Sequence, residues 1–144
     1  MKCHRLSSTV IISCITSPFA GPLAAQTILD ELRRPPGMSE FGCALVSVDD
    51  VDGDGVRDLA VTSCDRSVHV FSSAHRRVIR SFDASDFVAG GHAVNFGLDL
   101  ASLGDIDGDG FGDLAIAQSS TITAGGTVWV VNARTGALIF RKDG

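Results

Sequence analysis

The chain has 144 residues and a formal net charge of −5, from 12 Lys and Arg against 17 Asp and Glu. This length suits one domain with a modest core. No basic patch favours nucleic acid as a partner, and no unbroken apolar stretch is long enough for a membrane span.

The first 25 residues have the pattern of a secretory signal peptide. Lys2 and Arg5 give a positive start, an apolar stretch follows, and small residues precede Gln26. This pattern predicts cleavage after residue 25 and a secreted or extracytoplasmic location. A lipoprotein signal is the alternative because Cys14 follows a short apolar run. The apolar sequence continues past this cysteine, so ordinary export is favoured.

Two nine-residue stretches, 50–58 and 105–113, share the pattern D-x-D-G-D-G-x-x-D. Each holds four carboxylates, and like charges at this density resist ordering unless a cation neutralises them. Calcium takes about six to eight oxygen ligands in a flexible geometry, so the sequence predicts two Ca²⁺ sites. Simple solvated turns are one alternative, which the repetition disfavours. An EF-hand is the other, but it needs a glutamate at position twelve, where this chain has Val61 and Ile116.

Short segments rich in β-branched residues flank each acidic stretch and predict a loop at the tip of a β-hairpin. The surrounding sequence also repeats, with a first repeat at 40–95 and a second at 96–144. Each repeat offers about four short strands, which is typical of β-propeller blades in an all-β fold. Residues 26–39 are a lead-in segment that forms either a helical turn or an added strand.

Each copy has Phe-Gly, then the acidic stretch, then Leu-Ala-Val or Leu-Ala-Ile, and in this the chain resembles the FG-GAP repeat family. The resemblance implies a β-propeller like that of integrin α subunits and of many secreted bacterial proteins. Neither copy has the Gly-Ala-Pro of the family name, which leaves the turn after the second strand open. The resemblance also implies these calcium ligands: the side chains of Asp50, Asp52, Asp54 and Asp58 with the carbonyl of Val56, and the side chains of Asp105, Asp107, Asp109 and Asp113 with the carbonyl of Phe111.

A closed propeller has about four to eight blades, so we interpret the two repeats as a piece of a longer propeller. Completion of the ring by self-association is the alternative. The expected partners are therefore further blades or a second copy, together with an extracellular protein or polysaccharide ligand.

The sequence favours a non-catalytic, exported, calcium-binding protein for adhesion or ligand binding. It has no Gly-x-Ser-x-Gly elbow and no His-Glu-x-x-His motif. One alternative is the non-catalytic propeller portion of a larger secreted hydrolase, and another is a remnant without a function of its own.

Five further residues carry expectations. If Val48 pairs with Leu59, Cys43 lies opposite Cys64, and a disulfide is favoured over two thiols in an oxidising compartment. His69 alternates with valines on a strand and is expected to face solvent. Of the rest, His75 is expected at a solvated turn, and Trp129 is expected to pack within a blade rather than bind sugar.

Overall fold

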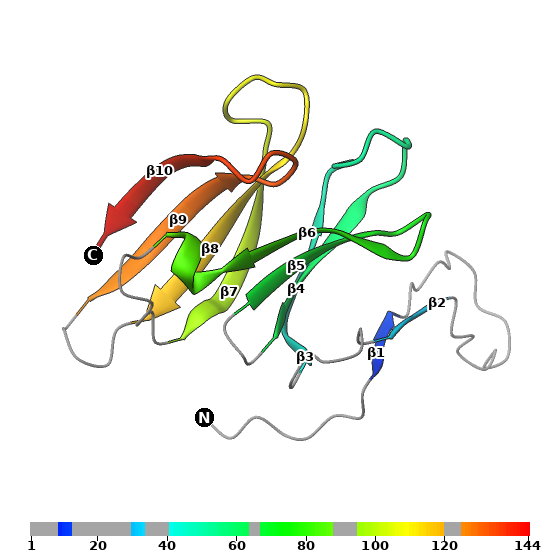
Figure 1. Ribbon diagram of the computed structural model, residues 1–144, viewed down its shortest axis with the longest axis horizontal. Coiled ribbons are helices and arrows are strands. Elements are labelled where there is room, and N and C mark those ends of the chain that lie inside the picture. Colours follow the sequence, from blue (N-terminus) through cyan, green and yellow to red (C-terminus); the bar gives the residue numbers. More distant parts are fainter. Residues whose placement is uncertain (1–8, 13–29, 34–40, 64–66, 88–94, 120–124) are drawn as a thin grey trace, which may run out of the picture.

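The computed structural model describes residues 9–12, 30–33, 41–63, 67–87, 95–119 and 125–144 and shows an all-β protein (Figure 1). A short 3₁₀ turn at Ala84–Asp86 follows the sixth strand. The strands are β1 (Thr9–Ile12), β2 (Asp30–Arg33), β3 (Phe41–Val48), β4 (Asp58–Ser63), β5 (Ser67–Ser72), β6 (Arg77–Asp83), β7 (Phe96–Gly104), β8 (Asp113–Ser119), β9 (Gly126–Asn132) and β10 (Leu138–Asp143).

Two four-stranded antiparallel sheets make up most of the molecule. One has the order β3-β4-β5-β6 and is called blade 1; the other has the order β10-β9-β8-β7 and is called blade 2. In each blade the strands follow one another in chain order, so each is a simple meander. The predicted all-β fold with four-stranded propeller blades is therefore confirmed.

The lead-in segment contributes a strand, one of the two expected conformations. Asp30–Arg33 forms β2 and pairs antiparallel with β1. Within the described ranges, no helix has the length and the apolar character that crossing a membrane requires.

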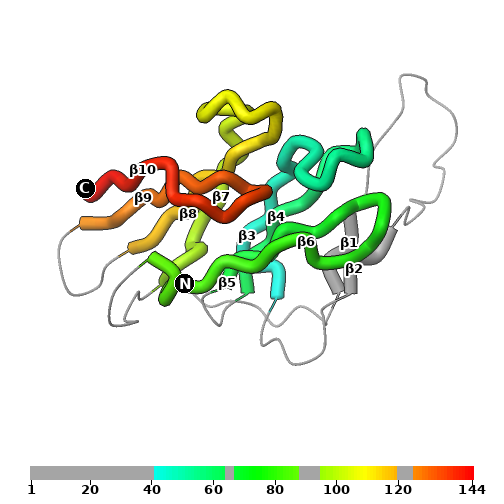
Figure 2. Tube along the Cα trace, turned by 45° about the horizontal axis from the view of Figure 1, so that its top comes forward, coloured from blue at the N-terminus to red at the C-terminus, as the bar shows by residue number. Residues whose placement is uncertain are grey.

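The blades pack face to face around one apolar core, with β3 and β7 adjacent where the sheets meet (Figure 2). Side chains alternate between the two faces of a strand, so every second residue of each blade faces the other blade. Trp129 is 2% exposed and its ring centroid lies 5.4 Å from that of Phe87, which confirms the expected packing role. The apolar core between the blades contains Val48, Ala60, Val68, Val70 and Phe82 from blade 1, and Leu100, Leu114, Ile116, Trp129 and Val131 from blade 2.

The Phe-Gly dipeptide that opens each blade has a physical reason. Gly42 and Gly97 have φ values of +90° and +75°, which favour glycine because a Cβ is strained there. A Cβ added at Gly97 would also lie 3.0 Å from methyl groups of Thr62 and Val68 in blade 1. The second glycine therefore allows a close approach between blades as well as the local turn of the chain.

The expected register of the first hairpin is off by one residue. Val48 pairs with Asp58 rather than with Leu59, and a bulge shifts the register further between Phe41 and Leu45. The register differs because Asp58 is the first residue of β4, where its carboxylate accepts hydrogen bonds from the backbone amides of Val51 and Ser73. Cys43 is disulfide-bonded, while its expected partner Cys64 lies outside the described residues.

His69 does not face solvent as expected. It is 5% exposed on β5, and its two ring nitrogens lie 2.9 Å from Ser67 Oγ and 2.8 Å from Ser81 Oγ. The prediction was wrong because both faces of this central strand are buried, and the two hydroxyls satisfy the imidazole there.

Candidate metal centre

The two acidic stretches connect β3 to β4 and β7 to β8, which confirms their predicted place at hairpin tips. We call residues 50–58 loop 1 and residues 105–113 loop 2. Both loops lie at the same end of the paired sheets (Figure 1; Figure 2). They are close neighbours, because a Cβ added at Gly112 would lie 2.9 Å from the Cβ of Asp49.

The first aspartate of each loop organises the backbone around itself. Asp50 Oδ1 accepts hydrogen bonds from the amides of Gly53 at 2.7 Å and Asp54 at 3.1 Å, and Oδ2 accepts from Gly55 at 2.7 Å. Asp105 accepts the equivalent three bonds at 2.7, 3.1 and 2.9 Å. The bond from Gly55, with those from the other amides, lowers the pKa of Asp50, so this carboxylate is held in its ionised form.

The last aspartate of loop 1 is fully buried at the start of β4. Asp58 Oδ2 accepts from the Val51 amide at 2.8 Å and Oδ1 accepts from the Ser73 amide at 3.1 Å. Burial nonetheless raises its pKa, and the charges of Asp52 and Asp54 add to this shift. A buried carboxylate beside two others is a place where a cation would be strongly stabilising.

Loop 2 ends in a similar way, but both hydrogen bonds reach the same carboxylate oxygen. Asp113 is fully buried, and its Oδ2 accepts from the amides of Ile106 at 2.7 Å and Asp107 at 3.3 Å. Its Oδ1 has no hydrogen-bond partner among the described residues. Burial, with the charges of Asp107 and Asp109, raises the pKa of Asp113.

The loops bring the predicted aspartates together in part. Ligand atoms of Asp50, Asp52 and Asp58 lie within 4.8 Å of one another in loop 1. The same holds in loop 2 for Asp105, Asp107 and Asp113.

The third aspartate of each loop stands somewhat apart. Asp54 Oδ1 accepts from the Val56 amide at 2.8 Å, and Asp109 Oδ1 accepts from the Phe111 amide at 2.8 Å. Asp54 forms a separate group with Asp52 and a histidine, whereas Asp109 belongs to none of these groups.

The sequence interpretation missed three residues that face the loops. His75, expected at a solvated turn, has Nδ1 3.0 Å from Asp54 Oδ2, and Arg77 Nη2 lies 3.3 Å from Asp52 Oδ2. In loop 2 the amide of Asn132 donates to Asp107 Oδ2 at 3.0 Å and to Asp109 Oδ2 at 2.8 Å. The signal for Asn132 was its place at the end of the third strand, directly before the turn. His75 and Arg77 carried no comparable local signal.

A divalent cation fits the donor set of both loops. Asp52 Oδ1 and Asp113 Oδ1 are buried without a hydrogen-bond partner among the described residues, and a native protein rarely leaves such atoms unpaired. The nearby donors are carboxylate oxygens, which suit hard cations such as Ca²⁺.

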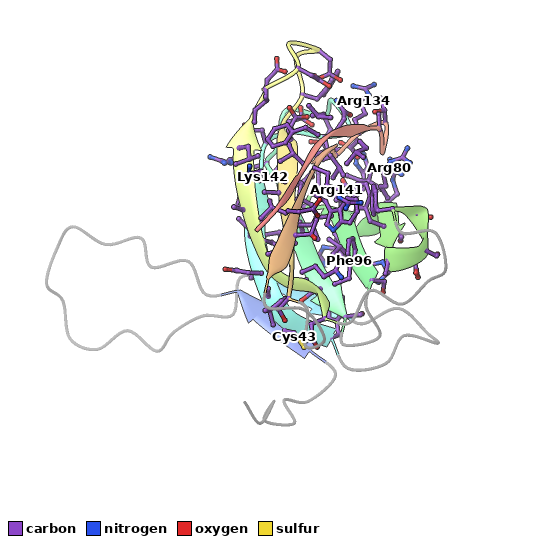
Figure 3. All side chains as sticks on the ribbon, turned by 90° about the vertical axis from the view of Figure 1, so that its left-hand side faces the viewer. Cys43, Arg80, Phe96, Arg134, Arg141 and Lys142 are labelled. Carbon is purple, nitrogen blue, oxygen red and sulfur yellow. The ribbon has the colours of Figure 1, made fainter. Side chains whose placement is uncertain are left out.

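One arginine from blade 2 ties the two loops together. The Arg134 guanidinium carbon lies 3.7 Å from the centroid of the Phe111 ring, and its charge contributes to the lowered pKa of Asp50. Arg80 Nε donates to the backbone carbonyl of Arg134 at 2.7 Å, and Figure 3 shows these two side chains close together. Loop 1, loop 2 and the turn after β9 therefore form one electrostatic unit.

Comparison with known proteins identifies both a family and a curated relative. A family model described as FG-GAP repeat matches residues 96–131. The chain is also 35% identical over 119 residues to integrin alpha-4 of Xenopus laevis, which covers 75% of this chain and 11% of that protein. The chain thus spans about a tenth of the length of this curated relative. No solved structure matches it significantly.

Proposed function

Because the chain belongs to the FG-GAP repeat family of integrin alpha-type β-propellers, we propose that it is a calcium-binding, non-catalytic propeller segment for adhesion or ligand binding outside the cell. Its two loops would hold one Ca²⁺ each. Its blades would present a binding surface built on that metal-stabilised end.

The single observation that carries the calcium proposal is the pair of fully buried carboxylates, Asp58 and Asp113, at the base of the loops. Each lies beside other carboxylates, and burial raises the pKa of both. A folded protein tolerates buried charges when they are paired or bind a metal. Calcium would supply the missing positive charge and would bind oxygen atoms that otherwise repel one another.

The ligands of loop 1 would be the side chains of Asp50, Asp52, Asp54 and Asp58 with the carbonyl of Val56. Those of loop 2 would be the side chains of Asp105, Asp107, Asp109 and Asp113 with the carbonyl of Phe111. Calcium here would be structural, because it would fix hairpin tips and not a catalytic water.

The proposal of adhesion or ligand binding outside the cell rests on similarity to an integrin α subunit. The ligand class would be an extracellular protein or a polysaccharide. Exposed apolar side chains of blade 2, including Leu98 at 56%, Val128 at 40% and Phe140 at 49% exposed, support contact with further blades or with a second copy.

Removal of calcium from the full-length chain tests the proposal. We expect two bound Ca²⁺ per chain by elemental analysis. At free calcium of about twenty times Kd, each loop adds roughly 2 kcal/mol to the free energy of unfolding. A chelator should therefore lower the melting temperature, and Asp58→Asn with Asp113→Asn should abolish this difference.

A carboxylate outside the loops provides the matched control. Asp143 pairs with Arg141 at 2.8 Å and is exposed, so Asp143→Asn should keep both metal ions and the full chelator effect. If chelation changes neither the metal content nor the melting temperature of the parent chain, the calcium proposal is wrong.

A further inference from the structure

Loop 1 has a nitrogen ligand within reach, and this separates it from an ordinary calcium loop. His75 Nδ1 lies 3.0 Å from Asp54 Oδ2 and 3.5 Å from Asp52 Oδ2. One ligand atom from each of these three residues falls within 4.8 Å of the others. Calcium selects oxygen ligands, whereas imidazole nitrogen suits zinc, copper, nickel and related ions.

The fold holds this histidine against the loop. His75 lies in the turn between β5 and β6, and its backbone amide donates to Ser72 Oγ at 3.1 Å. The same hydroxyl lies 3.1 Å from His75 Nδ1. The imidazole is therefore held over the carboxylates, while its side chain stays 54% exposed to a metal ion from solution.

Asp52 supplies an independent sign of a missing ligand. Its side chain is only 10% exposed, and its Oδ1 is buried with no hydrogen-bond partner among the described residues. Its Oδ2 is contacted by the exposed Arg77 at 3.3 Å and by His75. An unpaired carboxylate oxygen in such a position costs free energy unless a cation or water binds it.

Loop 2 cannot offer the same ligand set. The turn after β9 has Thr135 at the place equivalent to His75. The carboxylates of Asp107 and Asp109 are instead contacted by the neutral amide of Asn132. Among the described residues near loop 2, the side-chain atoms able to bind a metal ion are thus oxygen atoms.

We propose that loop 1, but not loop 2, binds a zinc-class transition-metal ion through His75 Nδ1 and the carboxylates of Asp52 and Asp54. At metal–ligand distances near 2.1 Å, tetrahedral ligands lie about 3.4 Å apart, and the observed 3.0 and 3.5 Å separations need little adjustment. The inference rests on the proposed function only in that the same carboxylates would otherwise hold calcium. Zinc and calcium therefore compete at loop 1.

Titration of the chain with Zn²⁺ at neutral pH tests this directly. We expect one tight zinc site per chain. His75→Gln should weaken it at least about tenfold, since even an outer-shell partner of a metal ligand contributes 10–100-fold. Asp54→Asn should weaken it similarly, whereas Asp109→Asn, the equivalent change in loop 2, should not.

Calcium titration separates this inference from the proposed function. The zinc-loaded chain should take up one Ca²⁺, while His75→Gln should take up two in the same zinc solution. Zinc binding without any calcium binding would uphold the inference and overturn the calcium proposal. Two calcium sites without a zinc site would do the reverse.

Co²⁺ serves as a spectroscopic probe that tests whether cysteines bind the metal ion. Cobalt at loop 1 should give visible absorption bands without the near-ultraviolet thiolate charge-transfer band, and His75→Gln should remove the visible bands. Zinc affinity equal in the parent and His75→Gln, or a thiolate band in the parent, overturns the proposal.

Discussion

Blade 1 and blade 2 share one backbone plan but differ in what contacts their acidic tips. In both loops the first aspartate accepts hydrogen bonds from three backbone amides. The last aspartate of each loop is buried at the start of a strand. Blade 1 adds the disulfide-bonded Cys43 and the side chains of His75 and Arg77. Blade 2 has Leu98 in the place of Cys43, and its loop is contacted instead by Asn132, the last residue of β9.

The two loops separate the features that follow from the motif from those that do not. The motif itself fixes the backbone of the loop, because the amides that donate hydrogen bonds to its first aspartate lie three to five residues after that aspartate. The side chains that face the carboxylates come from the end of the third strand and the segment after it, where the two copies differ. Two loops with one motif can thus differ in metal preference and in stability.

Loss of the disulfide that distinguishes blade 1 should lower the free energy of unfolding the most. Cys43→Ser should lower the free energy of unfolding by about 3 kcal/mol, the chain-entropy value for a loop of roughly 20 residues. Denaturant titration measures the change. Leu98→Ser at the equivalent place in blade 2 is the control and should cost about 1 kcal/mol or less, since Leu98 is 56% exposed.

The partner of Cys43 can be identified in the same experiment. Peptide mapping without reductant should recover Cys43 joined to Cys64. A link to Cys3 or Cys14 would contradict the predicted pairing across the first hairpin.

A second prediction concerns the glycine by which blade 2 approaches blade 1. Gly97→Ala should cost about 2–3 kcal/mol, because alanine is strained at φ +75° and its Cβ would lie 3.0 Å from Thr62 and Val68 methyl groups. Gly104→Ala is the matched control. It has φ +70° but open space around it, so only about 1 kcal/mol of backbone strain should remain. Equal losses of unfolding free energy in the two variants would show that the close approach of the blades at Gly97 adds nothing to the cost of the Cβ.

The sequence predicted the local structure well. Strands, hairpin tips and the position of each acidic loop follow from alternation, turn residues and repetition, and all concern residues close together in the chain. The positive φ of Gly97 was not predicted as such, but the Phe-Gly repeat marked the place. Most of what failed depends on a third strand.

The missed features of the metal centre have that common cause. His75 reaches the loop from a turn more than fifteen residues further along the chain, and Asn132 does so in blade 2. His69 was misplaced because its burial depends on both neighbouring strands. The register error at Val48 arose because the sequence does not show that Asp58 belongs to the strand.

A third prediction exchanges the neutral residue of blade 2 for a charged one. Asn132→Asp keeps an acceptor for the amides of Arg134 and Thr135 but loses the two bonds donated to Asp107 and Asp109. In chelator we expect a loss of about 2 kcal/mol, within the range for hydrogen bonds to charged groups. In calcium the loss should be smaller, because the cation offsets the added negative charge.

Melting curves with calcium and with chelator measure this difference. Ser72→Ala, at the equivalent place in blade 1, is the control. Its buried hydroxyl accepts from the His75 amide at 3.1 Å and lies 3.4 Å from Asp54 Oδ2. Since this variant adds no charge, it should cost about 1 kcal/mol both with calcium and with chelator. The same loss for Asn132→Asp with and without calcium would show that loop 2 holds no cation.

The smallest expected effect is a pH dependence that both blades share. Asp58 and Asp113 have pKa values raised by burial above their ordinary value near 3.8. The folded, metal-free chain therefore holds these protons more tightly than the unfolded chain does. The resulting stability is fully present below that ordinary pKa and is lost as the pH rises through the raised folded pKa.

Calcium reverses this sign, because it binds only the deprotonated carboxylates. The rise in melting temperature that calcium produces should therefore grow between about pH 4 and pH 7. Asp58→Asn and Asp113→Asn should each remove part of this growth, since each takes one raised carboxyl away. Asp143→Asn should not, because the Arg141 side chain lowers the pKa of Asp143 and it lies outside both loops. A calcium effect that stays constant over this range would mean that the two buried carboxyls do not hold the cation.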